Sequence, residues 1–80
     1  MGSNIVGMDI ERLAYALRCN PRRRQLLTLI QQSDLPDEAV DYLEDVYVRN
    51  TVYLNDLRRV LATADSLDEV YAIVKEFQRE

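Results

Sequence analysis

The sequence predicts an all-α domain, a compact bundle of about five short amphipathic helices. Apolar residues recur three and four positions apart through most of the 80-residue chain, the period of a helix with one buried face. The chain has only two Gly and two Pro, too few for the many turns of an all-β domain. Its 48% hydrophobic and 30% charged residues are typical of a globular protein.

A single domain is expected over residues 9–80, because a chain of this length has room for one core. Residues 1–8 carry both glycines and show no apolar periodicity, so we expect a flexible tail or a remnant of cloning there. Asp9 is the expected N-cap of the first helix. The buried stripe of that helix comprises Ile10, Leu13, Ala14 and Leu17.

Later helix starts are marked by capping residues. Asn20 is a good N-cap and Pro21 suits the first helical position, which predicts a second helix there. Pro36 predicts the start of a third helix. Ser66 and Glu69 have the capping-box spacing of a final helix. The apolar stripe of that helix comprises Leu67, Val70, Tyr71, Val74 and Phe77.

The segment VYVRNTVYL, residues 46–54, decides between two architectures. One helix over 36–64 would be about 43 Å long, whereas a domain of this size is only about 30 Å across. The β-branched residues of the segment are also weak helix formers. We therefore expect a break near 49–51, where Asn50 or Thr51 caps a new helix. The alternative is four helices with one long central helix, in which Asn50 would set the register of a dimer seam.

The residue types on which most enzymes depend are scarce. The chain has no His, no Gly-rich phosphate loop and one cysteine, Cys19, so general-base, metal and thiol chemistry lack their usual residues. We expect no enzyme, no cofactor and no metal site. No apolar run is long enough to span a membrane, and a lone cysteine fits a reducing compartment. A cytoplasmic protein without a membrane partner is therefore expected.

Three consecutive arginines are the most unusual feature. Arg22, Arg23 and Arg24 occupy the expected first turn of the second helix, where cations oppose the helix dipole. They would form a basic corner. Three uses are open: pairing with the acidic face of this same chain, binding an acidic protein partner, or binding nucleic-acid phosphates.

An acidic helix face is the second candidate site. The third helix has four acidic residues opposite its apolar arc, and this acidic face comprises Asp37, Asp41, Glu44 and Asp45. It is expected to be solvated or to dock a basic partner. Tyr15 and Tyr42 fall toward the polar sides of their helices and are possible interface aromatics. Tyr47 and Tyr71 fall on apolar stripes and are expected in the core.

LAYALRCNPRRRQLLTLI, residues 13–30, resembles the opening of winged-helix repressors of the ArsR type. The resemblance implies DNA binding, with a recognition helix and a β-wing to follow. An acidic helix is expected after it instead. The size and charge pattern of the chain are also similar to those of helical adaptor domains of the death-fold kind.

The leading hypothesis is a protein–protein interaction module, an adaptor or a self-associating domain, that uses the basic corner and the acidic face. One alternative is a DNA-binding transcriptional regulator that contacts phosphates through the three arginines. The net charge of −4 and pI near 4.7 weigh against nucleic acid without excluding it. Another alternative is a structural dimer joined through the long central helix.

Overall fold

The computed structural model describes residues 2–63 and 67–78. Over these residues the chain forms helices joined by turns, with no strand. The helices are α1 (Gly2–Cys19), α2 (Arg23–Gln31), α3 (Asp37–Arg49), α4 (Leu54–Thr63) and α5 (Leu67–Gln78). The predicted all-α bundle of five helices is therefore confirmed, and the β-wing implied by the winged-helix resemblance is not among the described residues.

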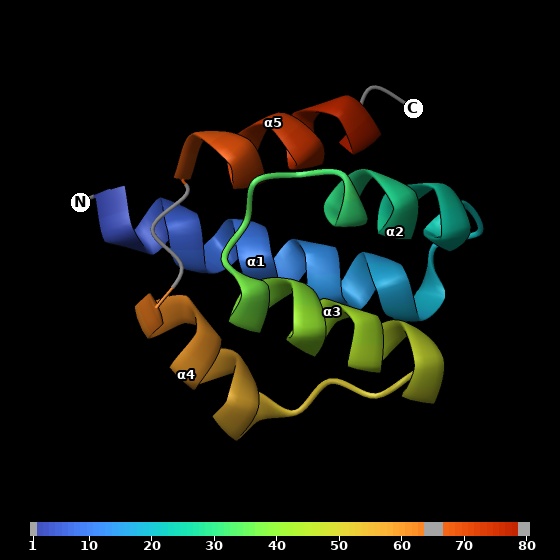
Figure 1. Ribbon diagram of the computed structural model, residues 1–80, viewed down its shortest axis with the longest axis horizontal. Helices are drawn as coiled ribbons and strands as arrows, with labels where there is room; N and C mark the ends of the chain where they lie inside the picture. The colour runs from blue at the N-terminus through green and yellow to red at the C-terminus, as the bar shows by residue number, and fades with distance from the viewer. Residues whose placement is uncertain (1, 64–66, 79–80) are drawn as a thin grey trace.

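Helix α1 lies at the centre of the bundle and contacts each of the other four helices. Figure 1 shows α2 and α5 on one side of it and α3 and α4 on the other. All four residues of its predicted apolar stripe are buried: Ile10, Leu13, Ala14 and Leu17. The predicted N-cap at Asp9 is wrong, because the helix begins at Gly2 and Asp9 lies inside it.

Helix α2 begins two residues later than the sequence predicts. Its first residue is Arg23, and Arg22 is its N-cap. Asn20 still organises the turn, since its Oδ1 accepts a hydrogen bond of 2.8 Å from the backbone N–H of Arg22. Its backbone carbonyl accepts the N–H of Arg23 at 3.1 Å. The side chain thus stabilises the turn before the helix instead of capping the helix itself.

The predicted break between α3 and α4 is confirmed. Asn50 takes the left-handed conformation, with φ of 58° and ψ of 37°, and its N–H donates to the Val46 carbonyl oxygen at 2.7 Å. This is the conformation in which many helices end. The prediction that Asn50 or Thr51 caps the start of the next helix is wrong, because Asn50 is the C-cap of α3 and α4 begins only at Leu54.

A single helix over 36–64 is therefore excluded, and with it the dimer seam that this helix would carry. The longest dimension of the bundle is 31 Å, less than the roughly 43 Å that such a helix would need.

The predicted stripe of helix α5 can be compared with the structure at Val70, Tyr71, Val74 and Phe77, because the side chain of Leu67 lies outside the described part of the chain. Val70, Val74 and Phe77 are buried, but Tyr71 is exposed, so its predicted place in the core is wrong. The Lys75 ammonium lies 5.7 Å from the centre of the Tyr71 ring instead. The capping box begins at Ser66, which lies outside the described residues.

The core draws on every helix and on the turn before α3. Its largest fully buried side chains are Ile10, Leu13, Leu17, Leu26, Ile30, Leu43, Val46, Val60 and Val70. Across the described residues, none of the helices is both long enough and apolar enough to cross a bilayer.

Candidate functional site

Arg23 of the basic corner is a structural residue. Its Nε donates a 2.6 Å hydrogen bond to the Leu17 carbonyl oxygen at the end of α1, and its Nη2 donates to the Tyr47 carbonyl oxygen at the end of α3. Pro21 explains the first bond, because the N–H that would reach the Leu17 carbonyl from four residues ahead belongs to a proline and does not exist. Arg23 supplies the missing donor.

The other two arginines of the corner have different surroundings. The Arg22 guanidinium carbon lies 4.6 Å from the centre of the Phe77 ring, and its Nε donates to Gln25 Oε1 at 3.0 Å. Arg24 is exposed. Arg22 and Arg24 also line a shallow groove between α2 and α5, where Glu76 opposes them. The three arginines therefore have different surroundings, and of the three only Arg22 and Arg24 line this groove.

The predicted acidic face is divided by the packing of α3. Glu44 turns toward α2, where its Oε2 accepts a 3.0 Å hydrogen bond from Gln31 Nε2. Asp37 is exposed at the start of the helix. Asp41 and Asp45 instead line an open groove between α3 and α4, and Asp45 also accepts a 2.7 Å ion-pair hydrogen bond from Arg49.

We call this hollow between α3 and α4 the acidic groove. It has a volume of about 470 Å³ and is lined by Glu38, Asp41, Tyr42, Asp45, Asp56, Arg59 and Val60. Three carboxylates come from α3 at positions i, i+3 and i+7, which places them along one side of the helix. Asp56 and Arg59 come from α4.

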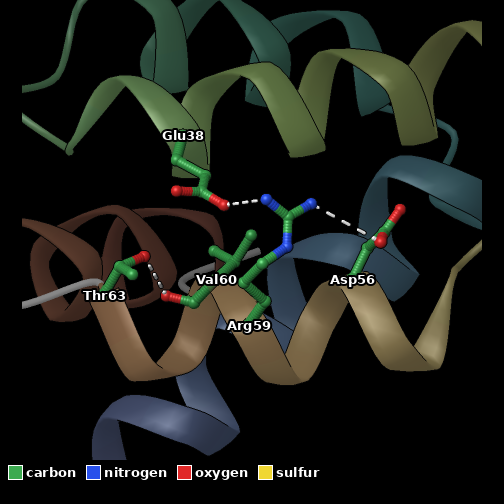
Figure 2. Close-up of polar contacts among 5 residues, drawn as sticks. All are labelled: Glu38, Asp56, Arg59, Val60 and Thr63. Carbon is green, nitrogen blue, oxygen red and sulfur yellow. Dashed lines mark hydrogen bonds and ion pairs between the residues drawn. The ribbon is translucent and has the colours of Figure 1, made fainter.

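Figure 2 shows how Arg59 crosses the acidic groove. Its Nη1 pairs with Glu38 Oε2 on α3, and its Nη2 lies 3.5 Å from Asp56 Oδ1 on α4. Below it, Val60 packs into the core, and the Val60 carbonyl oxygen accepts a 3.0 Å hydrogen bond from Thr63. The guanidinium of Arg59 thus forms ion pairs with one carboxylate on each of the two helices.

Tyr42 belongs to the floor of the acidic groove and is only 6% exposed. The predicted exposure of this side chain is therefore wrong. Burial raises the pKa of its hydroxyl, and nearby acidic groups such as Asp56 raise it further. Tyr15 is exposed, as the sequence predicts, whereas Tyr47 is partly buried against the core.

Apolar side chains lie beside the acidic groove. Val48 is 78% exposed and Leu54 is 59% exposed. Leu54 lines a second hollow together with Tyr53 and Asp56, so the two hollows share the Asp56 carboxylate. Val48 lies three residues after Asp45 and seven after Asp41, so it lies on the same face of α3 as these two carboxylates.

Sequence patterns alone missed several of these residues. Glu38 was detectable in principle, because it precedes Asp41 and Asp45 at helical spacing. Asp56 and Arg59 carry no such signal, since their position depends on how α4 folds back against α3. Within the described part of the chain, no group of three or more His, Cys, Asp or Glu side chains is arranged to hold a metal ion. Cys19 is exposed, and its Sγ donates to the Tyr15 carbonyl oxygen at 3.2 Å.

Known proteins provide no further guide to these residues. No family model, no curated protein and no solved structure matches the chain. The chemistry of its surface must therefore be inferred from the residues themselves.

Proposed function

We propose that the protein is a non-enzymatic interaction module whose acidic groove binds a basic segment of a partner protein. The observation that carries this proposal is the convergence of carboxylates from two helices on one open groove with exposed apolar side chains beside it. Such a surface suits a segment with Arg or Lys on one side and apolar residues on the other.

Charge complementarity defines the partner. Four carboxylates and the single guanidinium of Arg59 line the acidic groove, which leaves three more negative than positive charges there. A cationic segment would be drawn toward this surface and held by ion pairs along α3. Val48 and Leu54 would add apolar contact, which favours a persistent complex over a purely electrostatic encounter.

The basic corner supports this role less well than the acidic groove. Arg23 is engaged by backbone carbonyls of α1 and α3, and Arg22 packs on Phe77. Arg24 alone extends from the corner as an exposed side chain. A grip on phosphates by three adjacent guanidinium groups is therefore not favoured, and neither is the DNA-binding alternative.

Binding of a basic peptide to paired charge variants tests the proposal. The probe is a fluorescein-labelled helical peptide of alanine and leucine with arginine at every fourth position, titrated by fluorescence anisotropy. The double variant Asp41→Asn/Asp56→Asn removes two carboxylates from the groove and is expected to weaken binding about tenfold. The control Asp37→Asn/Asp68→Asn removes two exposed carboxylates outside it and is expected to weaken binding less than about twofold.

Equal losses in the two double variants would contradict a specific groove. Two further measurements address the other hypotheses. Light scattering at low and high salt tests whether a second copy of the chain occupies the groove. If it does, the protein forms an oligomer that dissociates at high salt, and the variant Asp41→Asn/Asp56→Asn does not form it. Titration with a DNA duplex is expected to give no binding at moderate salt, and binding that weakens steeply with salt would favour the regulator instead.

A further inference from the structure

Arg59 occupies the acidic groove as a partner's cation would. We propose that its guanidinium is an internal competitor, which holds the place of a partner's arginine and is exchanged for it on binding. This inference rests on the proposed function and adds both the preferred side chain of the partner and the regulation of the site.

The geometry around Arg59 favours a guanidinium over an ammonium group. Its two terminal nitrogens face carboxylates on different helices, Glu38 on α3 and Asp56 on α4. A planar guanidinium presents donors in a fixed fork and spans both carboxylates, whereas a lysine ammonium acts as a compact point charge. The groove is therefore expected to prefer arginine to lysine in a partner.

Exposure makes the exchange feasible. The Arg59 side chain is 63% exposed, and both of its partners are substantially exposed. Ion pairs in such positions contribute little to stability because water and salt compete for both charges. The anchoring of α4 depends instead on Leu57 and Val60, which are buried in the core. Arg59 can leave the groove without detaching the helix.

Two other carboxylates extend the site beyond the position of Arg59. Asp41 is exposed, and Asp45 is shared with Arg49, which lies at the far end of α3. A partner helix with arginines one turn apart would place one guanidinium between Glu38 and Asp56 and the next beside Asp41 or Asp45. Release of Arg59 therefore opens the inner part of a longer acidic track.

The test compares Arg59→Gln with Arg58→Gln. Both changes remove one positive charge from neighbouring exposed positions of α4, but Arg58 does not line the groove. With the arginine peptide described above, Arg59→Gln is expected to bind about three- to tenfold more tightly than the unaltered protein. Arg58→Gln is expected to change binding less than about twofold, because Arg58 does not line the groove and water and salt screen the charge of its exposed side chain. Lysine in place of arginine in the peptide is expected to weaken binding to Arg59→Gln.

Circular dichroism and thermal unfolding of both variants verify that the fold is intact. Arg59→Lys, which keeps the charge and the aliphatic stem, is a second variant for the case that Arg59→Gln does not fold. It should bind the arginine peptide more tightly than the unaltered protein does. If the Arg59 variants bind the peptide measurably, but no more tightly than the unaltered protein does, Arg59 is not a competitor. The acidic groove would still be a binding site. Absence of binding in every variant would overturn the proposed function itself.

Discussion

The guanidinium of Arg23 lies over the ring of Tyr47, 4.1 Å from its centroid, and donates a hydrogen bond to the carbonyl oxygen of the same residue. Through its bond to Leu17 it also reaches the end of α1. One side chain from α2 thereby joins the carboxyl-terminal ends of α1 and α3. Figure 1 shows these two helix ends on the same side of the bundle, next to the start of α2. A positive charge is favourable at both ends because the helix dipoles are negative there.

Replacement of Arg23 by lysine is expected to destabilise the protein although the charge is kept. An ammonium group cannot reproduce the fork that serves both carbonyls and stacks on Tyr47. We expect a loss of about 1–3 kcal/mol in the free energy of unfolding, measured by urea denaturation. The control, Arg24→Lys at the neighbouring exposed position, should change it by less than about 0.5 kcal/mol. Similar effects at the two positions would show that the contacts of Arg23 contribute nothing to stability.

The basic corner shows a limit of reasoning from sequence. Arg22, Arg23 and Arg24 are identical in type and adjacent in the chain, so the sequence predicts one surface. Their roles separate only when α3 and α5 are in place, because Tyr47 and Phe77 provide the rings on which two of them stack. The missing backbone donor at Pro21 is the local signal in the sequence that a nearby arginine turns inward.

The stability of the protein is expected to depend on which type of side chain stands at position 50, and not on the size of that side chain. Asn50 is the only non-glycine residue with a positive φ among those described. Side chains that begin with a Cβ atom disfavour this left-handed region, and asparagine tolerates it because its short polar side chain can form local hydrogen bonds. Asn50→Ala should lower the free energy of unfolding by about 1 kcal/mol, whereas Asn50→Gly should be neutral or slightly stabilising. Thermal unfolding of both variants measures the difference. A glycine variant less stable than the alanine variant would contradict a left-handed end to α3.

Helical periodicity predicted the fold well because most buried positions recur on one face of each helix. The stripe of α1 and the break after Arg49 both follow from local rules of spacing and propensity. Tyr42 and Tyr71 were misplaced because their burial depends on neighbours from other helices. Tyr42 is covered where α4 packs beside α3, while Tyr71 faces away from the bundle. The acidic groove was only half predicted for the same reason, since Asp56 and Arg59 arrive from α4.

The buried ring of Tyr42, and not its hydroxyl, is expected to stabilise the protein. The hydroxyl lies 3.5 Å from the Tyr53 carbonyl oxygen, which is a weak hydrogen bond. Tyr42→Phe should therefore cost less than about 1 kcal/mol, whereas Tyr42→Ala should cost about 3–5 kcal/mol by leaving a cavity under the acidic groove. Tyr15→Ala, at an exposed ring, should cost less than about 1 kcal/mol. A large loss in the phenylalanine variant, measured by urea denaturation, would assign the hydroxyl a larger role.

Asp9 is expected to reduce stability at neutral pH. It is 7% exposed within α1, and its Oδ2 has no hydrogen-bond partner among the described residues. Burial raises its pKa, and the nearby Arg12 only partly opposes this effect. Because the folded-state pKa lies above the unfolded value, folding favours the protonated carboxyl. The protonated carboxyl of Asp9 therefore adds to the free energy of unfolding. This contribution is complete below the unfolded-state pKa and is lost as the pH rises through the folded-state pKa.

Asp9→Asn should therefore be more stable than the unaltered protein near pH 7, and the difference should shrink as the pH falls toward about 4. Urea denaturation of both proteins at several pH values measures the difference in their free energies of unfolding and how that difference changes with pH. Asp37→Asn is the matched control, since Asp37 is exposed at the start of α3 and its loss should slightly weaken that helix through the dipole. An Asp9→Asn variant that is less stable near pH 7 would show that the ionised carboxylate is held by a favourable contact. A gain that does not depend on pH would point instead to the packing or helix propensity of the asparagine.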